Sequence, residues 1–228
     1  MDQMKRYAIY YTPQAGAFAA AAAAWLGWDL AGARPVAQPS PDLPRPLAEV
    51  TAVPRKYGFH GTIKPPFRLA DGVSFTDLDE AVAGMASGLK PVAFPALQII
   101  NLHGFLALVP QGDPAALQAL AGEVVRVLDP YRATLTETEI ARRRPERLTP
   151  RQRDLLATYG YPYVMEELRF HLTLSGPLSD AEVPVVTQAA AQHFAQTLPQ
   201  PFRLGDLSLC GEDDQGRFHL LHRYALMA

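Results

Sequence analysis

Two short stretches of the sequence share a residue pattern that could carry acid–base chemistry. One reads Phe59-His60-Gly61-Thr62-Ile63-Lys64 and the other reads Phe170-His171-Leu172-Thr173-Leu174-Ser175. Each continues to a proline followed by an apolar residue. The alternation of apolar and polar residues predicts half-buried strands, because successive side chains of a strand point to opposite faces. Each copy would then present an imidazole and a hydroxyl about 7 Å apart along one strand face.

Two such strands lying side by side could hydrolyse a phosphodiester. Histidine has an unperturbed pKa near 6.5, so one neutral imidazole could take a proton from water while the other, protonated, supplies a proton to the departing alkoxide. The threonine hydroxyls could hydrogen-bond non-bridging phosphoryl oxygens, where charge grows in the transition state. The candidate catalytic residues are therefore His60, Thr62, His171 and Thr173. Which histidine would be the acid and which the base is not fixed by the pattern.

Simpler interpretations compete with this one. A lone histidine on a strand is more often a hydrogen-bonded structural residue, but two matched copies in matching surroundings are harder to explain that way. A zinc site needs three or four protein ligands. Neither motif strand supplies an acid or a cysteine beside its histidine, so we expect no metal and no cofactor. We interpret the remaining histidines as turn, helix-surface or strand residues, namely His103, His193, His219 and His222.

Further residues are candidates for substrate binding. Lys64 is expected on the same strand face as His60, and Ser175 is the matching position of the second copy. Arginines at 142, 143, 144 and 147 form the one locally basic segment, and they could bind a second, non-reacting phosphate through bidentate contacts. A run of arginines is also typical of a solvated surface. The candidate substrate-binding residues are Lys64, Ser175, Tyr57, Arg143 and Tyr163.

The elements that must position these residues occur in the same order after each motif. The first motif precedes a helix over about 77–89 and a hairpin formed by two apolar runs, 92–102 and 105–109. A further helix is expected to begin at Asp113-Pro114 and to end at about residue 128. The second precedes a helix over about 179–198, opened by a capping box, and strands over 202–210 and 217–226. His60 and His171 are 111 residues apart, close to half of the 228-residue chain. This order indicates an internal duplication with pseudo-twofold symmetry.

The rest of the chain frames these repeats. We expect a strand over 7–11 and a helix through the alanine run to about residue 28. Residues 33–54 contain six prolines, so we expect an extended loop without regular elements, which is either part of the site, such as a lid, or a surface excursion. Residues 129–169 have no counterpart in the first half, and Thr149-Pro150-Arg151-Gln152 predicts a helix there that ends at Gly160. We therefore expect one bilobal domain over 1–228, with halves of about 1–128 and 129–228 and an arginine-rich insertion over 129–169.

Composition limits the partners and the compartment. The net charge of −2 and a pI near 6.3 provide no global positive field for nucleic acid or anionic lipid, so any anion site must be local. The single cysteine, Cys210, excludes an internal disulfide and fits a reducing, cytoplasmic location. The apolar stretch near the N-terminus is too short to span a membrane, and residues 6–13 fit a strand better than a signal peptide.

The paired Phe-His-x-Thr motifs resemble the 2H phosphoesterase superfamily, which includes cyclic nucleotide phosphodiesterases and RNA 2′,5′-ligase-like proteins. Over nearly the whole chain, the sequence is also similar to a bacterial family of that superfamily associated with phosphonate-utilisation operons. The segments that carry this narrower similarity are Arg6-Tyr7-Ala8-Ile9-Tyr10, Trp25-Leu26-Gly27, Tyr57-Gly58-Phe59-His60, residues 142–148 and Gly160-Tyr161-Pro162-Tyr163.

The resemblance implies an α+β fold of two pseudo-symmetric lobes, each an antiparallel sheet with helices on its outer face, around a central cleft. It also implies that the two histidines and two threonines are catalytic. A cyclic phosphate of a phosphorylated ribose is the substrate that the operon context suggests. Two other functions stay open. One is an RNA-end 2′,3′-cyclic phosphodiesterase or 2′,5′-ligase-like enzyme, which would contact only an RNA terminus. The other is a module that binds a phosphorylated ligand without turnover. The oligomeric state is not predicted.

Overall fold

The computed structural model describes residues 4–228, which form an α+β fold with antiparallel strands. The strands are β1 (Arg6–Tyr11), β2 (Trp28–Asp29), β3 (Arg34–Pro35), β4 (Gly61–Phe67), β5 (Val92–Phe94), β6 (Leu97–Asn101), β7 (Leu106–Pro110), β8 (Leu172–Thr173), β9 (Phe202–Leu204), β10 (Asp206–Glu212) and β11 (Phe218–Ala225). The α-helices are α1 (Ala17–Leu26), α2 (Leu47–Val50), α3 (Ala52–Arg55), α4 (Phe75–Ser87), α5 (Ala115–Val127), α6 (Glu137–Arg142), α7 (Pro150–Tyr159) and α8 (Glu182–Phe194). Short 3₁₀ turns cover Asp129–Tyr131, Pro145–Arg147 and Met165–Glu167.

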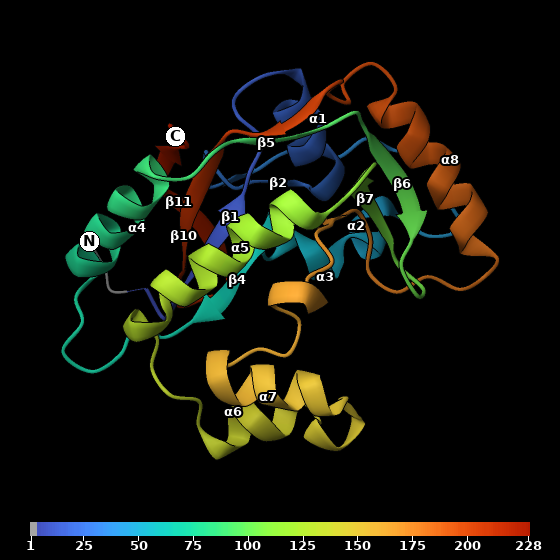
Figure 1. Cartoon of the computed structure of the whole chain (residues 1–228). Coiled ribbons are helices and arrows are strands. Elements are labelled where there is room, and N and C mark those ends of the chain that lie inside the picture. The colour runs from blue at the N-terminus through green and yellow to red at the C-terminus, as the bar shows by residue number, and fades with distance from the viewer. Residues whose placement is uncertain (1–3) are drawn as a thin grey trace.

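The two motif strands are neighbours at the centre of the main sheet. Its seven strands follow the order β11-β10-β1-β4-β8-β7-β6, so β4 and β8 join a four-stranded part to a three-stranded part. Two small ribbons, β2–β3 and β5–β9, lie outside this sheet. Figure 1 shows α4 beside the end formed by β10 and β11, and α8 beside β6 at the other end. The motif strands therefore connect these two parts of the antiparallel sheet.

The hairpins that follow the motifs are exchanged between the two parts. The β6–β7 hairpin comes after the first motif, yet β7 pairs with β8 of the second motif. The β10–β11 hairpin comes after the second motif, yet β10 pairs with β1, which pairs with β4 of the first motif. Each part of the sheet therefore contains strands from both halves of the sequence. Because the exchange interlocks the halves, neither half contains a complete sheet of its own.

The sheet buries side chains on both faces. The larger core combines one face of the strands with apolar side chains of α1, α4, α5 and α8, including Trp25, Val82 and Phe194. A smaller cluster occupies the opposite face and contains Tyr10, Trp28 and Phe218. Alternation along β1 explains this division, because Ile9 points to the larger core and Tyr10 to the smaller cluster. The smaller cluster covers only part of its face, next to the motif residues.

Most of the expected elements are present, with four differences. The strand expected over 202–210 is divided at Gly205 into β9 and β10, which belong to different sheets. Residues 33–54 contain regular structure, namely β3, α2 and most of α3. Leu47 and Val50 are buried in the larger core and so attach this segment to the body of the molecule. The apolar run 92–102 is not one strand but two, since Pro95 falls between β5 and β6. The helix expected over 179–198 forms only over Glu182–Phe194, although the Ser179–Glu182 contact is present.

The insertion over 129–169 contains no strand and lies to one side of the sheet, where α6 and α7 form a pair (Figure 1). The Thr149–Gln152 capping box opens α7, and Gly160 ends it in the left-handed conformation, as predicted. Leu155 of α7 and Val164 pack on Val125 of α5, which attaches the insertion to the body of the molecule. Among residues 4–228, no helix combines the length and the apolar character needed to cross a membrane.

Candidate active site

The register between the motif strands brings the four candidate catalytic residues together. Gly61 of β4 pairs with Leu172 of β8 in antiparallel orientation. Continuing this register by one residue in each direction places His60 opposite Thr173 and Thr62 opposite His171. Directly opposed residues of antiparallel strands have Cβ atoms about 5 Å apart. The two histidines and two threonines therefore occupy the corners of one small quadrilateral, related by a local twofold axis.

The motifs differ at their third residue for a packing reason. A Cβ atom on Gly61 would lie 2.3 Å from Cζ of Phe170, so only glycine fits beneath that ring. The matching residue of the second copy, Leu172, is fully buried. Phe170 thus fills the space that a leucine would take in the first copy. The two motif strands can approach closely because the missing side chain at Gly61 leaves room for the Phe170 ring.

Both histidines are held by the same hydrogen bond. His60 Nδ1 lies 2.9 Å from the carbonyl oxygen of Gly58, and His171 Nδ1 lies 2.7 Å from that of Arg169. A carbonyl oxygen can only accept, so Nδ1 donates in both rings. In each neutral ring, Nε2 is then the unprotonated nitrogen. Nε2 is therefore the atom available to exchange a proton with a ligand.

The surroundings of the two rings differ. The Tyr10 ring packs against the His60 ring with centroids 4.0 Å apart, whereas Phe105 contacts the His171 ring at 5.7 Å. The pKa of His60 is lowered to about 4, chiefly by burial; the hydrogen bond to Gly58 opposes this shift, and the nearby His171 adds to it. His60 is therefore neutral at pH 7.

A cleft of about 790 Å³ opens over the quadrilateral. Its lining contains all four candidate catalytic residues and three of the five candidate substrate-binding residues, Tyr57, Arg143 and Tyr163. It also contains Tyr10, Val53 and Phe105, for which the sequence predicted no role in the site, and His103, for which it predicted a structural role. Tyr10 could have been found from the alternation of β1. Val53 belongs to the proline-rich segment, so that segment forms part of the cleft wall.

Lys64 is turned away from His60, contrary to the expected alternation. Ile9 pairs with Lys64 and Tyr10 pairs with Thr62, so one step on β1 matches two steps on β4. This β-bulge at Ile63 reverses the alternation and directs Lys64 towards α5. The ammonium lies 3.3 Å from the carbonyl oxygen of Val125, and the residue is only 2% exposed.

Ser175 is also outside the cleft. It is 1% exposed, and its hydroxyl accepts a hydrogen bond from the backbone N–H of Leu106 and donates one to the carbonyl oxygen of Gly176. This hydroxyl is fully used by the backbone. Ser175 therefore has a structural role, although it occupies the position in the second motif that matches Lys64 in the first.

The arginine segment divides between the cleft and a smaller pocket beside it. Arg143 lies over the Tyr161 ring, 4.7 Å from its centroid, and lines both hollows. Arg142 lines only the smaller pocket. Arg144 and Arg147 line neither of these two pockets. Among residues 4–228, no three histidine, cysteine, aspartate or glutamate side chains gather as a set that could hold a metal ion.

One family model matches the chain. It carries the description "Protein of unknown function (DUF1045)" and matches residues 62–219, which include Thr62 and the whole second motif. The chain belongs to the DUF1045 family. The family match covers most of the elements around the cleft, although it begins two residues after His60.

Two curated relatives share sequence over nearly the whole chain. Both are named "Ribose 1,5-bisphosphate phosphokinase PhnN". The protein of Janthinobacterium sp. (strain Marseille) is 37% identical over 94% of this chain, and that of Laribacter hongkongensis (strain HLHK9) is 34% identical over 98%. These matches cover 49% and 52% of the relatives. The chain therefore spans about half the length of the curated relatives it matches.

Solved structures of similar arrangement are more distant. "Crystal structure of E.coli LigT complexed with 3'-AMP" is 14% identical, with 99% of this chain and 100% of that chain covered and a TM-score of 0.47. "Crystal structure of phosphoesterase" is 15% identical, with the same shares covered and a TM-score of 0.44.

Proposed function

We propose that this protein is a phosphoesterase of the 2H type that hydrolyses a small cyclic phosphodiester by acid–base catalysis, without a metal. The observation that carries the proposal is the quadrilateral of His60, Thr62, His171 and Thr173 at the floor of an open cleft. Two imidazoles with free Nε2 atoms and two hydroxyls on one strand face are the groups that such a hydrolysis needs.

The proposed reaction assigns different roles to the two histidines. His60 is neutral at pH 7 because burial lowers its pKa, so its Nε2 accepts a proton from the attacking water. The water oxygen forms a bond to phosphorus, and the phosphorus–oxygen bond of the cyclic ester breaks. His171, as imidazolium, gives its Nε2 proton to the departing alkoxide. Thr62 and Thr173 donate hydrogen bonds to the non-bridging oxygens. The product is a phosphate monoester beside a free hydroxyl.

A cyclic phosphate of a phosphorylated ribose is the substrate that we favour. Two relatives carry ribose 1,5-bisphosphate in their names. Hydrolysis of ribose 5-phosphate 1,2-cyclic phosphate at the bond to the 2-oxygen would produce this compound. The cleft of about 790 Å³ has room for one such sugar. The resemblance to proteins of phosphonate-utilisation operons supports a place in phosphonate metabolism.

An RNA-end phosphodiesterase is the second candidate. The cleft is open, and an RNA terminus carrying a 2′,3′-cyclic phosphate presents the same reacting group. A net charge of −2 disfavours a long basic track for the strand. Activity on cyclic-phosphate RNA ends that falls steeply with salt would favour this alternative. Tight binding of the cyclic sugar without product would instead favour a binding module.

The test is hydrolysis of ribose 5-phosphate 1,2-cyclic phosphate by the purified protein in excess chelator. We expect His60→Ala and His171→Ala each to lower kcat at least 100-fold. His222→Ala is the matched control, because His222 on β11 pairs with Asp79 of α4 and does not line the cleft. The acidic limb of kcat/KM should fall near pH 4, well below the ordinary histidine value, since it reports His60 in the free protein. Full activity of both cleft variants would refute the proposal.

A further inference from the structure

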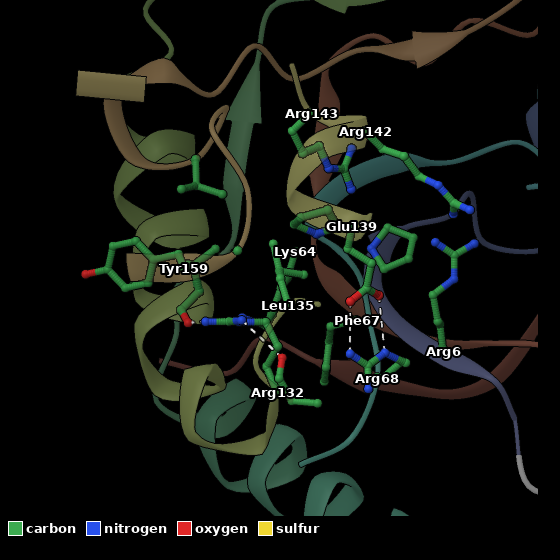
Figure 2. Close-up of a pocket in the computed structure, with 16 residues that line it drawn as sticks. Arg6, Lys64, Phe67, Arg68, Arg132, Leu135, Glu139, Arg142, Arg143 and Tyr159 are labelled. Atoms are coloured by element: carbon green, nitrogen blue, oxygen red, sulfur yellow. Dashed lines mark hydrogen bonds and ion pairs between the residues drawn. The ribbon is translucent and has the colours of Figure 1, made fainter. Parts of the chain in front are cut away.

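A second, smaller pocket of about 310 Å³ adjoins the cleft between the sheet and the insertion. Figure 2 shows arginines from distant parts of the chain around it. We call it the arginine pocket and define it by six cationic side chains of its lining: Arg6, Lys64, Arg68, Arg132, Arg142 and Arg143. Its volume is about ten times that of one water molecule in the liquid, which is enough for a phosphate group.

Acidic partners neutralise only part of this charge. Among the lining residues that the structure describes, Glu139 is the one acid, and Arg68 binds it and lowers its pKa to about 2 (Figure 2). From outside the lining, Glu212 pairs with Arg6, and Asp129 pairs with Arg132 at 2.9 Å. Asp129 also reaches Lys64, but only at 4.0 Å.

Arg142 and Arg143 are the cations available to a ligand. Within residues 4–228, neither guanidinium has an acidic partner at ion-pairing distance or donates a side-chain hydrogen bond. Arg143 is held over the Tyr161 ring at the boundary with the cleft, and Arg142 faces the space near Arg6 (Figure 2). Two guanidiniums can bind the oxygens of a phosphate group in a bidentate manner.

The floor of the pocket carries a buried charge. Lys64 is 2% exposed and lies among Val125, Phe67 and Asp129. Burial of an ammonium costs free energy unless anions or dipoles surround it. One carbonyl oxygen at 3.3 Å and one carboxylate at 4.0 Å leave this ammonium weakly compensated. An anion above the floor would supply the missing negative charge.

The arginine pocket lies next to the cleft. Arg6, Pro65, Pro66 and Arg143 line both hollows, so β1, β4 and the arginine segment form a shared wall. A ligand with its cyclic phosphate over His60 and His171 can therefore extend a second group past Arg143 into the smaller pocket.

We infer that the arginine pocket binds a second phosphate group of the substrate, one that is not hydrolysed, and so selects cyclic phosphodiesters that also carry a phosphate monoester. This inference rests on the proposed function, because it locates the reacting phosphate over the histidines. Arg142 and Arg143 contact the second phosphate, and Lys64 contributes charge from below.

The experiment compares two substrates that differ by one group, ribose 1,2-cyclic phosphate and its 5-phosphate. We expect the protein to favour the 5-phosphate by about 10- to 100-fold in kcat/KM, the usual effect of hydrogen bonds to charged groups. Arg142→Ala should remove most of this preference by raising KM for the 5-phosphate while kcat stays unchanged. Its kinetics with ribose 1,2-cyclic phosphate should not change. Arg147→Ala is the matched control, since it removes the same charge from the same segment outside both pockets.

The possible results separate the inference from the proposed function. Equal kcat/KM for the two substrates, or an equal loss on both in Arg142→Ala, would overturn the second-phosphate site while leaving the hydrolase intact. If neither substrate is hydrolysed, the proposed function fails, and calorimetry with ribose 5-phosphate decides the site. Binding that Arg142→Ala weakens and Arg147→Ala does not would support it. An absence of binding, or an equal loss in both variants, would overturn it. Circular dichroism of each variant checks that the fold is retained.

Discussion

The titration of His60 should make the stability of this protein fall in mildly acidic solution. Burial lowers the pKa of this imidazole from 6.5 to about 4 in the folded protein. In the unfolded chain the side chain regains its ordinary pKa. Between pH 6.5 and 4, the unfolded state therefore binds a proton on this imidazole that the folded state does not bind. The folded state has its full advantage above pH 6.5 and loses it as the pH falls towards 4.

The magnitude follows from the size of the shift. A difference of about 2.5 pKa units corresponds to about 3 kcal/mol of unfolding free energy, of which about 2 kcal/mol is lost by pH 5. Replacement of His60 by glutamine removes the titrating group while it keeps a polar side chain. Because the other titrating groups are common to both proteins, the difference between them isolates this one residue.

The assay is urea-induced unfolding of the protein and of His60→Gln at pH 7.5, 6, 5 and 4.5. We expect the unfolding free energy of His60→Gln, relative to the unmodified protein, to rise by about 2 kcal/mol between pH 7.5 and 5. His222→Gln serves as the control, because this histidine lies on the surface beside Asp79. Parallel pH curves for the protein and for His60→Gln would show that the His60 pKa is not depressed, and the assignment of His60 as the base would lose its support.

Three further outcomes are expected. Gly61→Ala should lower the unfolding free energy by about 1–3 kcal/mol in urea titrations, because its Cβ would lie 2.3 Å from the Phe170 ring. Gly84→Ala in α4 is the control, since open space surrounds that position and no such loss is expected. Equal effects of the two substitutions would contradict the packing argument. Burial lowers the pKa of Lys64 to about 8, so the contribution of this side chain to stability becomes more favourable as pH rises from 8 to 10.5. The unfolding free energy of the protein, relative to that of Lys64→Met, should therefore rise by about 2 kcal/mol between pH 8 and 10, and an unchanged difference would contradict the lowered pKa. Thr62→Val and Thr173→Val should each lower kcat about 100-fold and leave the melting temperature nearly unchanged. The corresponding serine variants, which keep a hydroxyl, should keep most of the activity. Full activity of the valine variants would exclude the hydroxyls from transition-state stabilisation.

Local sequence patterns predicted the elements whose stability is local. The capping box that opens α7 and the glycine that ends it identified this helix, because caps satisfy backbone groups within one turn. The alternation within each motif predicted the strands, and the duplication pointed to the motif residues that meet at the cleft. Proline content misled for residues 33–54, since their burial against the core supports α2 and α3 despite the prolines.

The sequence by itself determined which residues could carry the chemistry and that two copies of them exist. Only the tertiary structure decided which neighbours they have. The bulge at Ile63, which turns Lys64 from the cleft to the arginine pocket, arises from the pairing of β4 with β1 and leaves no mark in the motif. The exchange of the two hairpins, and the presence of Arg6 and Arg142 in the lining of one pocket, likewise bring distant segments of the chain together. Such contacts depend on how whole elements pack, and a residue pattern of short range cannot specify them.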